Sequence, residues 1–199
     1  MRKTLLALIG LTALTRVALA APETFDFKDP KGVNNIVFKL DAVLEATEGS
    51  ANGITGSVTF DPENPGLTRG KLAVASASLH VPNPMMKGHL HGPQWMDVAK
   101  YPEIRFKSTR IETDSSGEYV VHGMLTIRDA TREVALHVEE VTPETRDPWG
   151  NIKMGATART KIRRGDFGLS WNMVLEAGGF LVGEEVSISI DAEMARRAG

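Results

Sequence analysis

Cysteine is absent from the 199 residues, and neither basic nor acidic residues are in large excess, since the formal net charge is only -2. Without cysteine, the chain cannot build a disulfide scaffold, a zinc–cysteine site, an iron–sulfur cluster or a thiol nucleophile. A chain this close to neutral is not expected to bind nucleic acid, because affinity for the phosphate backbone depends on clustered Lys and Arg. The hydrophobic content of 42% excludes a disordered chain and provides for one sizeable core.

The first residues have the three-part pattern of a secretory signal peptide. Arg2 and Lys3 are followed by an apolar run from Leu5 to Leu14, and Ala18-Leu19-Ala20 then forms a small-x-small cleavage site. Arg16 ends the run before it reaches the roughly 20 apolar residues that a transmembrane helix needs. The pattern therefore predicts a cleaved leader and no stable membrane span.

This interpretation divides the chain into two parts. We expect residues 1–20 to be removed by a cut after Ala20, and residues 21–199 to form one exported domain. The leader carries basic residues and no acid, so the mature chain is more acidic than the full sequence. We expect the protein to be periplasmic or secreted.

Alternation of apolar and polar residues dominates the rest of the chain. Clusters of turn-forming residues, as at 49–53, 61–66 and 114–117, separate segments in which every second residue is apolar. Such regularly spaced strands predict an all-β fold, an antiparallel barrel or sandwich. We expect strands at Phe25–Phe27, Ile36–Leu44, Ile54–Phe60, Leu72–Val81, Ile104–Ile111, Tyr119–Arg128, Glu133–Val141, Lys153–Arg163 and Glu185–Glu193.

Residues 82–102 break this rhythm with a long segment rich in Met and aromatic residues. We expect a short helix there, around Lys87–His91 or Gln94–Val98. Long insertions in compact β domains are often functional. Leu90, Trp95 and Met96 would close one end of a barrel, whose interior holds either packed side chains or one small ligand.

The histidines suggest a possible metal site but do not establish one. His89 and His91 would share a face on a strand, but residues at i and i+2 do not share a face on a helix. A metal site needs about three converging ligands, and His80, His122 and His137 lie on separate predicted strands. We therefore expect no metal and no catalytic residue. A metal-dependent or hydrolytic enzyme that uses His89 and His91 is the alternative.

The run Arg163-Arg164-Gly165-Asp166-Phe167-Gly168 combines cations, an acid and an aromatic ring. An arginine can hold a phosphate or carboxylate in a bidentate fork. Equally, Arg164 and Asp166 could pair with each other and stiffen a corner between a strand and a loop. Both interpretations stay open at this point.

Motifs along nearly the whole mature chain resemble the YceI-like family of exported bacterial proteins. The most specific are Asp97-Val98-x-x-Tyr101-Pro102-x-Ile104-x-Phe106 and Arg164-x-Asp166-Phe167-Gly168. Shorter matches are Gly56-x-Val58-x-Phe60-Asp61-Pro62, His89-Leu90, Gly123-x-Leu125-Thr126-Ile127 and Val186-x-Ile188-x-Ile190.

The resemblance implies an extended, lipocalin-like antiparallel barrel with an apolar tunnel for a polyisoprenoid, an isoprenoid quinone tail or another lipid. It implies a protein that binds, stores or carries this molecule, not an enzyme, with no cofactor beyond the bound isoprenoid or quinone. We expect the tunnel to be lined by Phe38, Leu40, Ala42, Leu90, Trp95, Met96, Phe106, Leu125, Ile127, Phe167 and Trp171. At its mouth, the residues that match the family's headgroup positions are His89, Arg164 and Asp166.

Two departures from the family pattern bear on the ligand. Met86-Lys87 stands where many members have Arg-Asp, and Ala42 stands where many have His. A less charged mouth favours a neutral quinone or other lipid over a diphosphate. A packed barrel that acts through its surface is a further alternative, and its exposed strand edges would favour a homodimer.

Overall fold

The computed structural model describes residues 21–28, 32–41, 46–61, 64–176 and 181–197. The predicted signal peptide, its cleavage site and Ala42 lie outside these residues. So does part of the predicted strand Ile36–Leu44.

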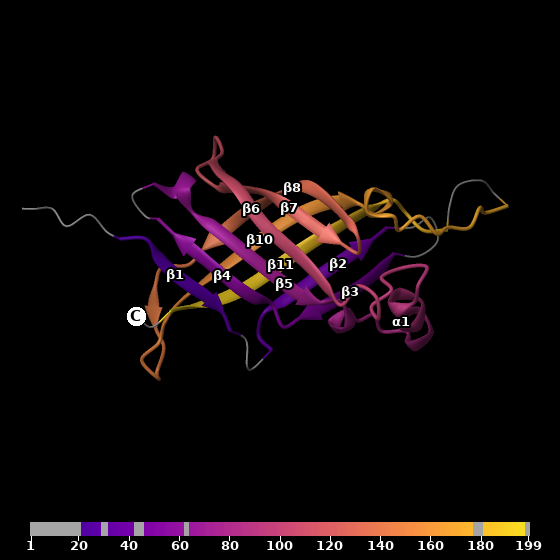
Figure 1. Ribbon diagram of the computed structural model, residues 1–199, viewed down its shortest axis with the longest axis horizontal. Coiled ribbons are helices and arrows are strands. Elements are labelled where there is room, and N and C mark those ends of the chain that lie inside the picture. The colour runs from indigo at the N-terminus through magenta and orange to yellow at the C-terminus, as the bar shows by residue number, and fades with distance from the viewer. Residues whose placement is uncertain (1–20, 29–31, 42–45, 62–63, 177–180, 198–199) are drawn as a thin grey trace, which may run out of the picture.

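The described chain is built almost wholly from antiparallel strands (Figure 1). The strands are β1 (Glu23–Phe27), β2 (Asn35–Leu40), β3 (Thr47–Asn52), β4 (Thr55–Phe60), β5 (Arg69–Ala75), β6 (Glu103–Thr113), β7 (Tyr119–Ile127), β8 (Ala130–Val141), β9 (Thr145–Arg146), β10 (Ile152–Arg163) and β11 (Glu185–Arg196). One α-helix, α1 (Pro84–His91), and three 3₁₀ turns at Pro65–Leu67, Ser76–Ser78 and Arg164–Phe167 complete it. The predicted all-β class is confirmed.

Eight of these strands close into a barrel. The ring runs β1-β4-β5-β6-β7-β8-β10-β11, and β11 returns to pair with β1. β10 and β11 pair along their whole common length, from Lys153 opposite Ala195 to Arg163 opposite Glu185. Each strand of the ring pairs with two neighbours, and the β8–β10 pairing, from Ala156 opposite Val141 to Arg159 opposite His137, completes the closure. The predicted antiparallel barrel, with a short helix at one end, is therefore confirmed.

The second edge of β11 is shared by two strands. β2 pairs with its first part, up to Asp191, and β1 pairs with Ala195 and Arg196. Between them, the Asn34 side chain makes the hydrogen bonds that a neighbouring strand would make. Its Nδ2 donates to the Glu193 carbonyl at 3.1 Å, and its Oδ1 accepts from the Glu193 amide at 2.7 Å. Asn34 is only 1% exposed, so this fork is sealed from solvent.

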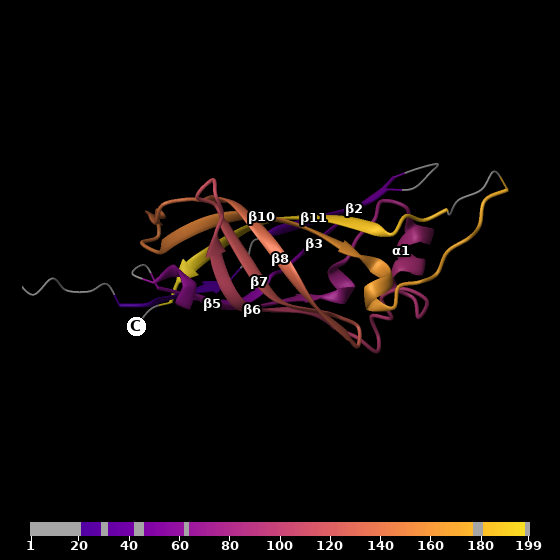
Figure 2. The same ribbon diagram turned by 90° about the horizontal axis from the view of Figure 1, so that it is seen from above.

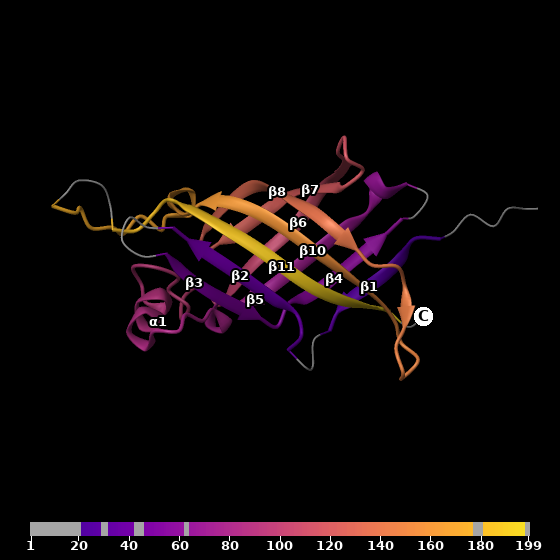
Figure 3. The ribbon, with the colours of Figure 1, turned by 180° about the vertical axis from the view of Figure 1, so that it is seen from behind.

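β2 and β3 extend the barrel wall at the end where α1 lies (Figure 3). β3 is joined in turn to the segment after β5, because Ser50 and His80 exchange backbone hydrogen bonds of 2.8 and 2.7 Å. Figure 2 shows α1 and the segment between β10 and β11 at this same end, opposite the C-terminus. The helix α1, the segment after β5 and the segment between β10 and β11 are therefore gathered at one end of the barrel.

The strand pattern departs from the sequence prediction at three places. The turn expected at 49–53 is wrong, because residues 47–52 form β3, whose small polar residues show no clear alternation. The strand expected at Leu72–Val81 ends at Ala75 and passes into the 3₁₀ turn. β8 begins at Ala130 instead of Glu133, because a two-residue turn with Arg128 at φ +57° starts the hairpin.

The barrel interior is packed at one end and hollow at the other. Phe25, Phe27 and Met194 are buried at the end that holds the termini, where they form part of the continuous hydrophobic core. Along β11, by contrast, the inward-facing residues nearer α1 border a cavity. The candidate site therefore lies in the α1 half of the barrel.

Candidate binding cavity

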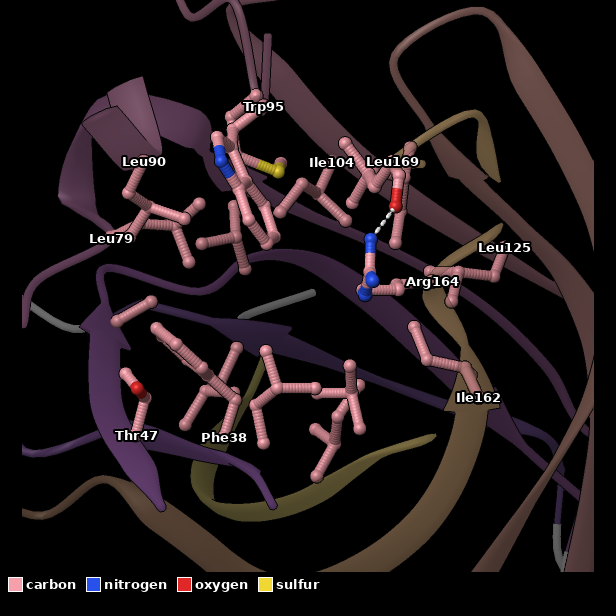
Figure 4. A pocket seen from close by; sticks show the side chains of 18 of the residues that line it. Phe38, Thr47, Leu79, Leu90, Trp95, Ile104, Leu125, Ile162, Arg164 and Leu169 are labelled. Atoms are coloured by element: carbon pink, nitrogen blue, oxygen red, sulfur yellow. Dashed lines mark hydrogen bonds between the residues drawn. The ribbon is translucent and has the colours of Figure 1, made fainter. Parts of the chain in front are cut away.

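An apolar cavity of about 550 Å³ lies inside the α1 half of the barrel (Figure 4). Of its 31 lining residues, 27 are hydrophobic and four are polar: Thr47, His89, Thr160 and Arg164. This volume lies within the range of small-molecule pockets, which also use a few polar groups among apolar walls. Met86 and His89 line the cavity and are exposed to solvent, so the cavity reaches the surface beside α1.

Period-two alternation brings the lining residues of each strand to the inside. On β11 these are Val186, Ile188 and Ile190, and the next buried position, Met194, belongs to the packed end. On the neighbouring strand β10, Ile162, which is the pairing partner of Val186, also borders the cavity. Because alternate side chains of a strand point to one face, β11 presents an apolar row to the lumen, and β10 contributes Ile162 and the polar Thr160. The cavity is closed at its inner end.

The cavity volume limits what it can enclose. A methylene group occupies about the volume of a water molecule in the liquid, ~30 Å³, so the cavity holds about 18 such groups. Each buried methylene contributes about 0.8 kcal/mol of transfer free energy. An apolar chain of this size would therefore gain considerable binding free energy from burial alone.

The residues at the start of α1 explain why a helix begins there. Asn83 is the N-cap, and its Oδ1 accepts from the amides of Met85 at 2.9 Å and Met86 at 3.2 Å, while Pro84 occupies the first turn. His91 Nε2 lies 2.7 Å from the Leu79 carbonyl and thus attaches the helix to the segment after β5. The predicted helix around Lys87–His91 is confirmed as part of α1.

The residues after α1 fold back over the cavity. The Met96 amide donates to the Leu90 carbonyl at 3.0 Å and the Asp97 amide to the Gly92 carbonyl at 2.9 Å. These bonds form turns, so the alternative helix at Gln94–Val98 is wrong. Asp97 has φ +45°, which redirects the chain, and Met96 is buried. Trp95 and Met96 both border the cavity at this end.

Arg164 is the charged group of the cavity wall, and its guanidinium is fully engaged. Nε donates to the Gly183 carbonyl at 2.6 Å, and Nη1 donates to the carbonyls of Leu169 and of Trp171, the latter at 3.0 Å. Nη2 donates to the Val182 carbonyl at 3.3 Å and to Glu184 Oε1 at 3.1 Å. A guanidinium has five N–H donors, and all five have partners here.

Residues 168–176 and 181–184 contain the groups that accept hydrogen bonds from Arg164, and Leu169, Trp171, Leu181 and Val182 among them line the cavity. We call these residues the covering loop. Its two arms are tied by Asn172, which donates to the Val182 carbonyl at 2.7 Å and accepts from the Val182 amide at 2.9 Å. The Leu181 amide also donates to the Met173 carbonyl at 2.8 Å. Arg164 therefore shapes the mouth through the backbone of the covering loop.

Two tryptophans meet where the covering loop faces the segment after α1. The ring centroids of Trp95 and Trp171 are 6.1 Å apart at an interplanar angle of 52°, a tilted arrangement that aromatic pairs favour. The Arg164 guanidinium lies 5.4 Å from the Trp95 ring centroid, within the range of a cation–π contact. The two covers of the cavity thus contact each other through aromatic surfaces.

The structure brings most of the predicted tunnel residues together around the cavity. Those in its lining are Phe38, Leu40, Leu90, Trp95, Met96, Phe106, Leu125, Ile127 and Trp171. Phe167 is 1% exposed but belongs to the packed core and not to the lining. Whether the lining residues bind a ligand stays a prediction.

The three residues predicted at the headgroup have different placements. His89 lies at the mouth, in the lining and exposed. Arg164 lines the cavity, yet its donors are used by the covering loop, so it is arranged to hold the loop and not a headgroup. Asp166 is exposed and outside the lining, and the hydrogen-bond partners of the Arg164 guanidinium are Glu184 and four carbonyls. The predicted Arg164–Asp166 pair is therefore not formed.

Sequence analysis missed several lining residues. Alternation within the predicted strands could have identified Leu72, Ile104, Val134, Val186, Ile188 and Ile190. Leu181 and Val182 of the covering loop carry no such signal, because Leu181 is placed by its hydrogen bond to the Met173 carbonyl and Val182 by those to Arg164 and Asn172.

The two neighbouring histidines do not converge. His89 faces the cavity mouth, whereas the His91 ring contacts the Leu79 carbonyl, as expected for positions i and i+2 of a helix. Among the described residues, no group of three or more His, Asp or Glu side chains could hold a metal ion. Within the same residues, no helix has the length and apolar character needed to cross a membrane.

Comparison with known proteins places this architecture in a family. The model of the YceI-like domain matches residues 29–194. A UPF0312 protein of Photorhabdus laumondii is 30% identical over 168 residues, which cover 84% of this chain and 86% of that protein.

Two solved structures share the fold. BcnA of Burkholderia cenocepacia superposes with a TM-score of 0.68 at 21% identity, over 80% of this chain and 95% of BcnA. A polyisoprenoid binding domain from Saccharophagus degradans, implicated in plant cell wall breakdown, has a TM-score of 0.57 at 9% identity, over 89% of this chain and 100% of that domain. At these identities, the likeness concerns the fold.

Proposed function

Because the chain belongs to the family of YceI-like domains, we propose that its barrel binds a long-chain hydrophobic molecule in the interior. The ligand class is a polyisoprenoid, an isoprenoid quinone or another lipid, which the protein stores or carries. The observation that carries this proposal is the apolar cavity of about 550 Å³, which is closed at its inner end and reaches the surface beside α1. Such a cavity suits a chain that enters from one end.

The lining supports a ligand without a charged headgroup. Among the described residues of the lining, Arg164 is the one Lys or Arg side chain, and its N–H donors are used within the protein. An anionic headgroup buried there would lack a free cation, and an unpaired buried charge is costly. A neutral quinone, alcohol or ester near His89 therefore fits better than a diphosphate.

The likeness to a polyisoprenoid binding domain gives independent support for the chain class. We also propose that binding takes place outside the cytoplasm, in the periplasm or in the secreted fraction, as the leader-like residues 1–20 suggest. A packed barrel that acts only through its surface is less consistent with a cavity of this size.

Extraction of the purified protein into organic solvent, followed by mass spectrometry, tests the proposal. We expect a hydrophobic chain molecule in near-stoichiometric amount. Ile162→Trp, which places a larger ring in the lumen, should reduce the amount recovered, because overpacking disfavours an occupied cavity. Arg163→Trp is the matched control, since Arg163 is the next residue on β10 and is exposed. No co-purified lipid and no binding of isoprenoid probes would rule the proposal out.

We propose a binding role in place of catalysis. If the protein were a metal-dependent enzyme, elemental analysis would find stoichiometric metal that is lost in a His89→Ala, His91→Ala variant. The separate directions of the two histidines are against this outcome. The absence of such metal would end the metal-dependent version of the alternative.

A further inference from the structure

Two glycines in the barrel wall lie beside phenylalanine rings that line the cavity. Gly49 on β3 is opposite Phe38 on β2, and Gly123 on β7 is diagonal to Phe106 on β6. A Cβ atom at Gly49 would lie 2.2 Å from Phe38 Cζ, and one at Gly123 would lie 2.3 Å from Phe106 Cζ. Carbon atoms pack at about 3.5–4.0 Å, so each ring occupies the space of a missing side chain.

This placement decides how far each ring enters the lumen. Side chains on a strand stand roughly perpendicular to the sheet, so an inward Phe would normally project into the barrel. Here the outer edge of each ring lies over the neighbouring strand, where only a glycine leaves room. Phe38 is seen in Figure 4 at the edge of the cavity. Both rings therefore lie along the wall and leave the centre open.

The arrangement is specific to the cavity half of the barrel. Gly66 meets only the Ile111 carbonyl, at 3.8 Å, and Gly88 has no neighbour within 4 Å. A Cβ at Gly70 would meet Val58, which is outside the cavity lining. Two separate strand pairs thus have the same arrangement, a glycine beside a phenylalanine ring, and in both the phenylalanine lines the cavity.

We propose that Gly49 and Gly123 set the width of the cavity and thereby let it accept a methyl-branched isoprenoid chain in addition to a straight alkyl chain. The inference rests on the proposed function, since it concerns the ligand of the same cavity. Branch methyls widen a chain without lengthening it. A closely packed interior responds to a volume change of even one methylene, so a ring displaced into the lumen would exclude the broader chain first.

The test compares two alcohols of equal main-chain length, geranylgeraniol, which is methyl-branched, and hexadecanol, which is not. Binding to delipidated protein is followed by tryptophan fluorescence, because Trp95 and Trp171 line the cavity. For Gly123→Ala, we expect the Kd for geranylgeraniol to rise by about tenfold or more and the Kd for hexadecanol to change by less than about threefold.

The second variant removes the clash. Gly123→Ala combined with Phe106→Leu should restore geranylgeraniol binding, and Gly66→Ala should leave both alcohols unaffected. An unchanged preference in folded Gly123→Ala, or a double variant that binds geranylgeraniol no better, would overturn the proposal. The corresponding pair is Gly49→Ala with and without Phe38→Leu, although a Cβ at Gly49 would also lie 2.5 Å from the His80 carbonyl.

Folding of the variants is itself informative, since a Cβ at Gly123 would also lie 2.6 Å from the Lys107 carbonyl. If Gly123→Ala fails to fold and the double variant folds, the ring is the obstacle, which supports the proposal. If both fail, the backbone demands the glycine, and the proposal is overturned.

The two proposals fail in different ways. A wild type that binds neither alcohol and yields no co-purified lipid overturns the proposed function, and xenon, which enters dry apolar cavities, then tests whether Gly123 sets the cavity width. Xenon bound in crystals of the wild type and lost in Gly123→Ala would support the inference. Equal xenon occupancy in both would overturn it.

Discussion

Arg164 is 1% exposed, yet it carries a full charge at the cavity mouth. It is stable there because the covering loop turns its carbonyls toward the guanidinium and Glu184 supplies a carboxylate. A charged group that is buried with all its hydrogen bonds made is far less costly than an unpaired one. The residue therefore links the end of β10 to the loop that covers the cavity.

Replacement of Arg164 by lysine should lower the free energy of unfolding by about 3 kcal/mol, because an ammonium group has three donors and no planar fork. At least two of the five acceptors would lose their partner. Urea unfolding followed by fluorescence measures the change.

The control for this variant is Arg163→Lys, since Arg163 is adjacent and exposed. It should change stability by less than about 0.5 kcal/mol. Equal unfolding midpoints for the two variants would contradict the role assigned to the Arg164 guanidinium.

The sequence marked Arg164 as important but could not identify its partners. Its run of residues suggested a fork for an anion or a pair with Asp166, but its guanidinium donates to Glu184 and to backbone carbonyls. The true partners are mostly backbone carbonyls between Leu169 and Gly183. Every residue has such a carbonyl, so no sequence pattern can reveal which ones a distant side chain will meet.

At the level of elements, the cover of the cavity combines α1, the turns after it and the covering loop. The helix could be predicted, because Asn83 and Pro84 form a local start signal. The contact of Trp95 with Trp171 could not, because it joins two segments that are far apart in sequence.

The change Trp95→Ala should loosen ligand retention more than it destabilises the fold. Trp95 is half-buried and contacts Trp171 and Arg164 instead of the packed core, and covering segments belong to the less stable parts of a protein. We expect the dissociation rate of a bound isoprenoid probe to rise about tenfold, which corresponds to a loss of ~1.4 kcal/mol. Stopped-flow fluorescence measures this rate, and thermal unfolding measures the stability.

Trp149→Ala provides the comparison. Trp149 is 72% exposed and outside the lining, so its loss should leave the dissociation rate unchanged. A Trp95→Ala protein with a lower melting temperature and unaltered ligand retention would contradict the covering role.

Sequence reasoning missed two strands entirely, the two-residue β9 and the longer β3. The residues of β3, from Thr47 to Asn52, are small or polar and read as a turn. They form a strand because β2 offers a complete edge and because Gly49 leaves room for the Phe38 ring. Strand formation here depends on tertiary pairing, which outweighs local propensity.

For the molecule as a whole, several carboxyl groups link stability to pH. The pKa values of four acids are held below their usual range, chiefly by side-chain hydrogen bonds: Asp26 from Arg197, Glu112 from Arg110, Asp114 from Ser116 and Asp147 from Asn151. As the pH falls, the unfolded chain binds protons before the folded protein does. The resulting stabilisation is complete above the unfolded pKa values and is lost toward the lower, folded ones.

We therefore expect the urea midpoint to be nearly constant from about pH 7 to pH 5 and to fall steeply below about pH 4. Asp26 is largely buried and accepts from Arg197 Nε at 3.1 Å, which joins β1 to the C-terminal residues. Asp26→Asn should be less stable at neutral pH and should lose less stability in acid. A variant whose midpoint falls in parallel with that of the wild type would contradict this.

The sequence by itself determined the class of the fold and most of its strands, because alternation with a period of two is a local property of each segment. It also determined that an irregular segment, residues 82–102, would interrupt the strands. Only the tertiary structure decided which strands close the ring, that Asn34 bonds to β11 between β1 and β2, and which end of the barrel is hollow. The reason is that these features depend on contacts between residues distant in sequence: Met194 and Phe25 fill one end, and two glycines leave space for phenylalanine rings at the other.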